Sequence, residues 1–183
     1  MSNNKYSKSF QIALSAIACA VAVVCLYVGT FSNVLLASGY ILASVALCIP
    51  LSKNFYLGDF LAYTGTCILT LLLGAIARVW DLVPFIAFFG LHPLANALFC
   101  KFKVNKIVAF IIKDIWFCLT VWLAYVIIFN GVIGSAESEL YALLNEYIWL
   151  AIPILGTVIF LVYDAFMQRM QRAVNVLVYK IKK

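Results

Sequence analysis

The sequence predicts an all-α membrane protein, a compact bundle of six transmembrane helices in one domain that covers residues 1–183. Three observations predict this class. The chain is 66% hydrophobic and 11% charged, with a mean hydropathy of +1.07, whereas a soluble domain is usually about 25% charged. Six apolar stretches fill its length, each near the roughly 20 residues that cross a bilayer as a helix. Basic side chains gather at alternate joints between these stretches.

The first three spans are expected near residues 9–29, 34–51 and 56–77. The apolar run after Lys5 and Lys8 is too long for a signal peptide and has no convincing cleavage site, so we expect a retained first span. The second span ends where Pro50, Ser52 and Lys53 interrupt the apolar run. The third ends at the joint of residues 78–81, which is the first strongly polar stretch after it.

The last three spans are expected near residues 82–100, 107–129 and 147–167, and a basic amphipathic tail follows at 168–183. Pro93 lies inside the fourth span, where it removes a backbone donor and clashes one turn back, so a kink is expected near Phe89. Gly90 makes room at that kink. Three lysines separate spans four and five, and the longest joint, residues 130–146, separates spans five and six.

The charge pattern predicts that both termini are cytosolic. The terminal segments and the second and fourth joints carry 11 of the 13 basic residues, and the other three joints carry only Arg78, with Asp81 beside it. The remaining basic residue, Lys113, lies within a span. Cytosolic loops of membrane proteins are enriched in Lys and Arg, and an even number of spans puts both ends on one side. We therefore expect a multi-pass protein of a bacterial plasma membrane, surrounded by the lipid bilayer.

Several functions are disfavoured by composition. The net charge of +6 is explained by cytosolic anchors rather than by nucleic-acid binding. Six cysteines without a CxxC pair and a single histidine predict no metal site, and we expect the cysteines to be buried apolar residues. No catalytic motif or P-loop occurs, so we expect no catalytic residues, no cofactor and no enzyme activity. An integral membrane enzyme would need convergent acids near His92, and the sequence supplies too few.

Candidate ligand-binding residues lie mostly at the outer joints. Arg78 and Asp81 are three apart and could pair across a helix end, and aromatic rings mixed with a few polar groups suit a small-molecule pocket. The alternative is that the tryptophans are interfacial anchors and the charges are solvated. The outer candidates are Arg78, Trp80, Asp81, Asn130, Tyr147 and Trp149.

Polar residues within the spans form a second set of candidates. His92 and Asn96 are four apart and so share a helix face, and polar groups at this depth are often functional. They are candidates for ligand contact, unless His92 only bonds a carbonyl freed by the kink. Lys113 and Asp164 are expected at similar depth and could form a structural ion pair. Asp114 is an alternative partner, and Lys113 could instead extend to the headgroups.

The first span carries small residues at a spacing of four. Ala16 and Ala20 are one such pair, and small residues at i and i+4 let another helix approach closely. This face could pack inside the bundle or form the contact with a partner helix.

Six spans, cytosolic termini and an alanine-rich first span resemble the substrate-binding S components of energy-coupling factor (ECF) vitamin transporters. The motifs FFGLHPL at residues 88–94 and GTVIFLVYD at 156–164 are similar to those of small Firmicute membrane proteins described as S-component-like. The resemblance implies an outer ligand pocket built from the later spans. It also implies that Ala16 and Ala20 contact a transmembrane ECF coupling protein, while two cytosolic ATPases supply energy.

The sequence therefore supports two hypotheses of different class. The first is a substrate-capture subunit for uptake of a small organic micronutrient, which works with a separate ATP-driven coupling module. The second is a non-transport accessory or scaffold protein that acts through helix–helix contacts.

Overall fold

The computed structural model describes residues 8–32, 34–73, 78–132 and 139–180, with side chains omitted at 128–132, 139–146, 148 and 180. These ranges contain helices and no strand, so the predicted all-α class is confirmed. The elements are α1 (Lys8–Phe31), α2 (Leu36–Leu51), α3 (Tyr56–Leu72), α4 (Val79–Pro84), the π-helix η2 (Phe85–Phe89), α5 (His92–Lys101), α6 (Lys106–Val132) and α7 (Glu139–Lys180).

Four helical segments within the described residues are long and apolar enough to cross a membrane. They are Lys8–Phe31, Val79–Lys101, Lys106–Ile127 and Trp149–Tyr179. Helices α2 and α3 are apolar but have only 16 and 17 residues, below the roughly 20 of a typical span. The predicted third span also extends into residues 74–77, which lie outside the described residues. The structure thus supports four spans by length and composition.

Small residues allow α1 and α2 to pack closely. Ala18, Ala22 and Ala43 are fully buried between them. A Cβ added at Gly39 would lie 2.9 Å from the Cα of Gly29 and 2.9 Å from the carbonyl oxygen of Cys25. The two backbones are therefore in contact, which is how small residues promote helix association in lipid.

An aromatic cluster forms the other half of the core. Phe88 of η2 is fully buried, and its ring centroid lies 5.1 Å from those of Trp116 and Phe117 on α6 and 6.0 Å from that of Phe160 on α7. Edge-on aromatic contacts at such distances stabilise a core beyond their buried area. This cluster fixes η2 against α6 and α7.

The predicted interruption of the fourth span is confirmed. The π-helix ends at Phe89, a turn follows, and α5 starts at His92. Pro93 lies in the first turn of α5, where its missing N–H is not needed. Side chains of other helices bond the backbone there: Ser44 Oγ donates to the Phe89 carbonyl oxygen at 2.7 Å, and Tyr63 Oη donates to the Ile86 carbonyl oxygen at 2.7 Å.

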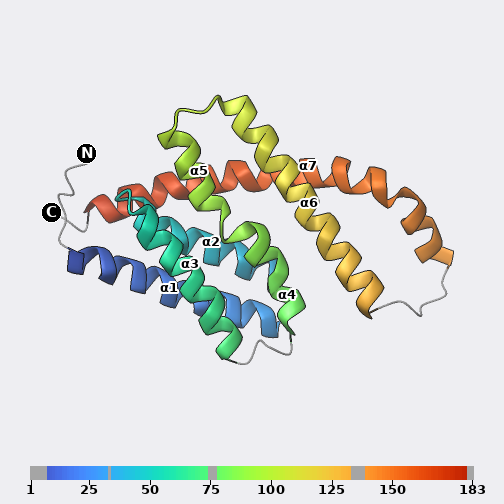
Figure 1. Ribbon diagram of the computed structural model, residues 1–183, viewed down its shortest axis with the longest axis horizontal. Helices are drawn as coiled ribbons and strands as arrows, with labels where there is room; N and C mark the ends of the chain where they lie inside the picture. The colour runs from blue at the N-terminus through green and yellow to red at the C-terminus, as the bar shows by residue number, and fades with distance from the viewer. Residues whose placement is uncertain (1–7, 33, 74–77, 133–138, 181–183) are drawn as a thin grey trace.

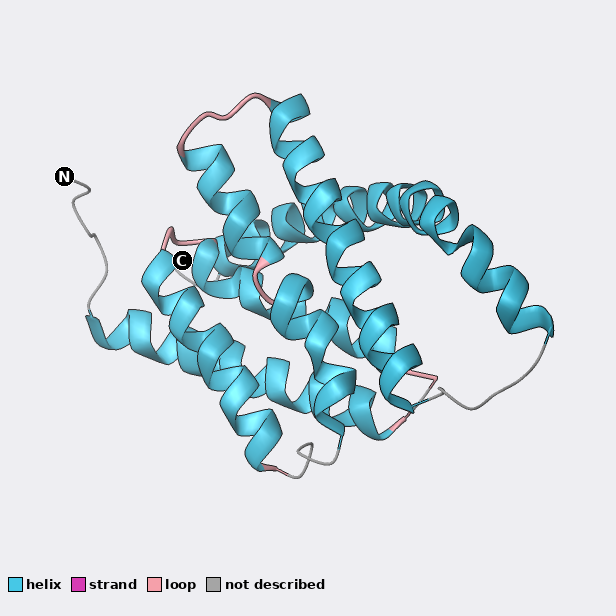
Figure 2. Cartoon of the chain, turned by 45° about the vertical axis from the view of Figure 1, so that its right-hand side comes forward, coloured by secondary structure: helices cyan, strands magenta, loops and turns pink. Residues whose placement is uncertain are grey.

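The predicted sixth span and basic tail form one helix. Helix α7 runs without a break over 42 residues, and Figure 2 shows it curving away from the body at its start. Pro153 lies in this stretch, and prolines bend helices. Helix α7 therefore extends along the whole molecule and contributes to both of its ends (Figure 1).

Basic residues gather at one end of the molecule, which we call the basic end. It comprises the start of α1, the joints at residues 52–55 and 102–105, and the end of α7 (Figure 1). The Lys53 ammonium lies 5.8 Å from the ring centroid of Tyr179, so the second joint and the end of α7 are close together. We call the opposite end, which includes Arg78 and the start of α4, the far end.

Candidate functional site

Arg78 and Asp81 connect helices at the far end. Arg78 Nη1 donates to the Thr30 carbonyl oxygen at 2.6 Å, and its guanidinium lies 6.0 Å from the ring centroid of Phe31. The hydroxyl of Tyr40 donates to the backbone carbonyl of Asp81. These contacts join the start of α4 to α1 and α2.

The remaining far-end candidates lie on other surfaces. Trp80 is 52% exposed, and Tyr147 and Trp149 of α7 are 59% and 67% exposed. The Trp149 ring lies 5.7 Å from that of Trp122 on α6. Asn130 is in α6, and its side chain lies outside the described part of the chain. The Trp149 ring thus packs against α6, whereas the contacts of Arg78 and Asp81 are with α1 and α2.

Lys113 and Asp164 form a buried ion pair between α6 and α7. Lys113 Nζ lies 2.5 Å from Asp164 Oδ1, and the two residues are 3% and 4% exposed. Asp114 instead accepts a hydrogen bond from Thr157 Oγ1 at 3.0 Å. An ammonium ion at this depth is costly unless it is paired, so each charge of the pair depends on the other for compensation.

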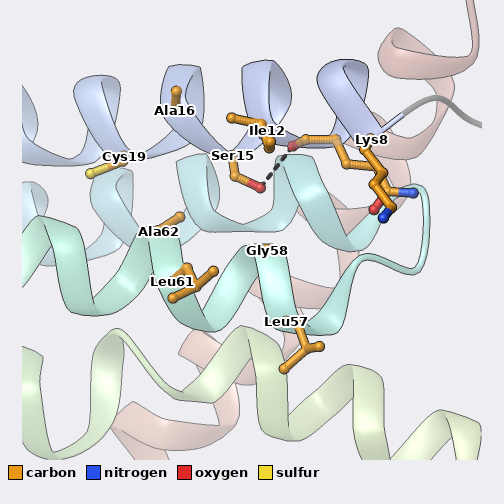
Figure 3. A pocket seen from close by; sticks show the side chains of 10 residues that line it. Lys8, Ile12, Ser15, Ala16, Cys19, Leu57, Gly58, Leu61 and Ala62 are labelled. Carbon is orange, nitrogen blue, oxygen red and sulfur yellow. Dashed lines mark hydrogen bonds between the residues drawn. The ribbon is translucent and has the colours of Figure 1, made fainter.

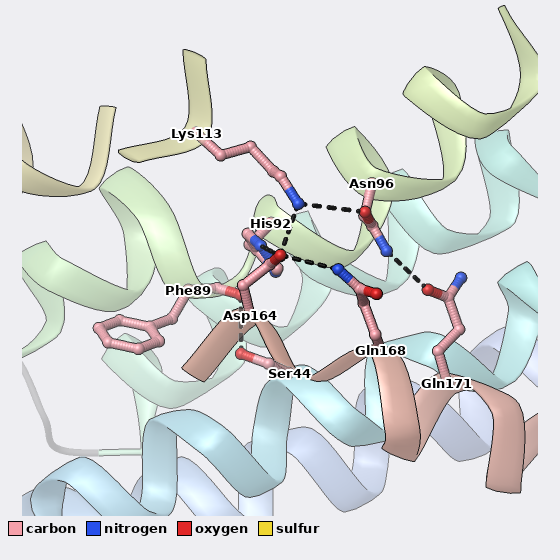
Figure 4. Close-up of polar contacts among 8 residues, drawn as sticks. All are labelled: Ser44, Phe89, His92, Asn96, Lys113, Asp164, Gln168 and Gln171. Atoms are coloured by element: carbon pink, nitrogen blue, oxygen red, sulfur yellow. Dashed lines mark hydrogen bonds and ion pairs between the residues drawn. The ribbon is translucent and has the colours of Figure 1, made fainter. Parts of the chain in front are cut away.

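His92 and Asn96 extend this pair into a network (Figure 4). His92 Nε2 lies 3.2 Å from Asp164 Oδ1. Lys113 Nζ donates to Asn96 Oδ1 at 3.3 Å, and Asn96 Nδ2 donates to Gln171 Oε1 at 2.9 Å. The predicted common face of His92 and Asn96 therefore points toward α6 and α7. The two residues are brought together with the ion pair, not with the far-end candidates.

Two glutamines of α7 complete the network and were not among the predicted residues. Gln168 Nε2 donates to Asp164 Oδ2 at 2.8 Å, and Gln171 accepts from Asn96. The sequence carries a signal for them, because Asp164, Gln168 and Gln171 follow the i, i+4, i+7 spacing of one helix face. We refer to Lys113, Asp164, His92, Asn96, Gln168 and Gln171 as the polar network.

A cavity of about 1060 Å³ opens from the polar network toward the basic end. Its walls come from α5, α6, α7 and the joints at 52–55 and 102–105. Five cationic residues and one acidic residue line it: Lys101, Lys103, Lys106, Lys113, Arg172 and Asp164. The cavity is partly open and combines apolar surface with convergent polar groups, a combination that small-molecule sites also show.

Asp59 is a further buried acid that the sequence reasoning overlooked. It lies in the first turn of α3 and is fully buried. Neither carboxyl oxygen has a hydrogen-bond partner in the described structure. Such a group lowers stability, because its lost hydration is not replaced. The only sequence signal was an acid near the start of an apolar run.

The face of α1 with Ala16 and Ala20 points away from the bundle. Both residues are exposed, whereas Ala18 and Ala22 are fully buried. Ala16 borders a groove of about 540 Å³ between α1 and α3, where Ser15 and Gly58 also lie (Figure 3). This face therefore remains available for contact with lipid or with another helix.

The described residues contain no cluster of three or more His, Cys, Asp or Glu that could hold a metal ion. Comparisons with protein-family models, with curated proteins and with solved structures found no match. The four long apolar helices indicate a membrane protein. The cavity and the exposed face of α1 are the two features that bear on a more specific function.

Proposed function

We propose that the protein is a six-span bundle of a bacterial plasma membrane, with α2 and α3 as shorter membrane-embedded helices. Both are apolar, and both pack against the long helix α1. The bilayer can thin locally around a short hydrophobic segment at modest cost. The basic end faces the cytosol in this proposal, because Lys and Arg are enriched on that side.

The function that we propose is substrate capture: a membrane-embedded subunit binds a small organic micronutrient for uptake. The cavity at the basic end is the observation that carries this proposal. It has the volume of a ligand site, and its floor is a network whose buried ion pair is expensive to maintain. The walls come from the later helices, as the resemblance implies, but the cavity opens at the basic end and not at the far end, where an outer pocket was expected. In this orientation the cavity opens on the side from which the ligand would leave for the cytosol.

A separate ATP-driven module would supply the energy, since the chain has no nucleotide-binding motif. In the proposed complex an ECF coupling protein contacts the exposed Ala16 and Ala20 face of α1, and two ATPases bind the coupling protein. The small side chains and the adjacent groove support this contact, because they allow a partner helix to approach closely.

Co-purification tests the complex. The tagged chain is co-expressed with an ECF coupling protein and its two ATPases, and the eluted complex is analysed by native mass spectrometry for bound subunits and retained small molecules. We expect Ala16→Trp with Ala20→Trp to abolish module binding while the chain stays folded. The matched control is Ile17→Trp with Val21→Trp, because these residues are also exposed and also four apart, but lie about 100° further round α1.

A scaffold function is the second candidate, and the contacts at the far end favour it. Arg78 and the Asp81 carbonyl serve to join helices there. A scaffold would retain no small molecule, and its partner would be a protein other than a coupling module. Module binding and a retained ligand would contradict it, whereas their joint absence would contradict substrate capture.

A further inference from the structure

We infer that the cavity at the basic end binds a phosphate-bearing ligand, whose phosphate contacts the cationic residues at the mouth. This inference rests on the proposed function, because it names the ligand class of the same site. The phosphate could belong to a phospholipid headgroup or to a soluble organic phosphate.

The lining of the cavity has an excess of positive charge. Five cationic residues and one acidic residue line it. That acid, Asp164, is already occupied by Lys113, His92 and Gln168. The acid therefore offers no counter-charge to the cations at the mouth, and the cavity attracts an anion.

The hydrogen-bond donors of the cavity lie at different depths. Lys113 is almost fully buried at the floor, whereas Lys101, Lys106 and Arg172 are exposed at the mouth. Between them, Gln171 uses its oxygen toward Asn96, and this leaves its amide nitrogen as a donor (Figure 4). A ligand entering from the basic end would thus meet cations first and amides below.

The cavity is large, and part of its wall is apolar. About 1060 Å³ is far more than a single inorganic anion needs. Leu51, Val104 and Phe110 add apolar surface to the lining, which suits a ligand with a carbon skeleton beside its phosphate. Lys and Arg are the usual phosphate-binding side chains, and basic pockets between membrane helices on the cytosolic side bind anionic headgroups.

Two variants with the same loss of charge test the inference. Each removes three positive charges at the basic end, but only the first removes them from the cavity lining. The cavity variant is Lys101→Gln, Lys106→Gln and Arg172→Gln, and the control variant is Lys8→Gln, Lys53→Gln and Arg169→Gln. The members correspond by position: one helix start, one residue at or beside a joint and one α7 arginine in each set.

The full chain is purified into detergent and titrated separately with phosphatidylglycerol and with glycerol 3-phosphate, and binding is measured by native mass spectrometry. We expect wild type and control to bind at least one probe, and the cavity variant to lose about tenfold or more in affinity. Binding of phosphatidylglycerol alone identifies a lipid source, and binding of glycerol 3-phosphate identifies a soluble one.

Three outcomes would overturn the inference. Neither probe binds wild type, both variants lose affinity equally, or the cavity variant binds as wild type does. Equal loss would show that the lysines are only cytosolic anchors. If neither probe binds, a neutral organic molecule retained by wild type in the same spectra would leave substrate capture intact although the phosphate inference fails. Unchanged thermal unfolding of both variants shows that all three proteins are folded.

Discussion

Removing the charge of Lys113 alone should destabilise the protein far more than removing both charges of the buried pair. In Lys113→Met the carboxylate of Asp164 keeps Gln168 and His92 as neighbours but loses the ammonium ion at 2.5 Å. The side chains of the pair are 4% and 6% exposed, so the carboxylate left behind is largely shielded from water. Breaking a buried pair in this way costs about 3–5 kcal/mol.

The double variant Lys113→Met with Asp164→Asn removes both charges and leaves a neutral amide beside Gln168. Replacing a buried pair as a whole is often close to neutral. We therefore expect the free energy of unfolding of the double variant to lie within about 1–2 kcal/mol of that of wild type. The double-mutant cycle, which also includes Asp164→Asn alone, should give a coupling energy well above the roughly 0.5 kcal/mol found for independent sites.

Equilibrium unfolding in detergent micelles, followed by tryptophan fluorescence, gives the free energy of unfolding of wild type, of each single variant and of the double variant. If Lys113 instead extended to the headgroups, its charge would be solvated. Lys113→Met would then cost less than about 1 kcal/mol, as for an exposed pair. That result would refute the burial of the Lys113–Asp164 pair, and therefore also the claim that this pair forms the floor of the cavity.

Three further substitutions test the packing of the bundle by the same unfolding measurement. Asp59→Leu should raise the free energy of unfolding by about 1–2 kcal/mol, because it removes a buried carboxyl group without a partner; a loss would show that the carboxyl group binds something. Gly39→Ala should cost about 1–3 kcal/mol, since its Cβ would meet the backbone of α1 at 2.9 Å. The control Gly65→Ala meets only a cysteine sulfur at 3.1 Å and should cost clearly less; equal costs would contradict the close helix contact. Ser44→Ala should cost about 1–2 kcal/mol by leaving the Phe89 carbonyl without its donor at 2.7 Å, and no change would show that this hydrogen bond does not stabilise the π-helix.

The helices and the interruption were predictable because they depend on local sequence. Apolar runs bounded by polar joints predicted the helices, and Pro93 with Gly90 predicted the break that η2 forms. The number of spans was harder to predict. Helix α2 ends at Leu51 as predicted, but it begins only at Leu36 because residues 34–35 form a turn, so an apolar run that approaches the length of a span gives a shorter helix.

The position of the site was less predictable than its chemistry. Depth along the helices placed Lys113 near Asp164, and the structure pairs them. Depth does not determine the rotation of a helix, so the convergence of His92, Asn96 and the α7 glutamines needed the fold. At the far end, Arg78 bonds a backbone carbonyl, and composition gives no information about such partners.

Labelling of Cys100 with a membrane-impermeant maleimide tests most directly whether the cavity opens to the cytosol. Cys100 lines the cavity and is exposed, which corrects the prediction that all six cysteines are buried. Intact cells and inside-out vesicles are labelled, and Cys100 is quantified by peptide mass spectrometry. We predict labelling in inside-out vesicles and none in intact cells. Labelling of Cys100 in intact cells would contradict the orientation and put the cavity on the outer side.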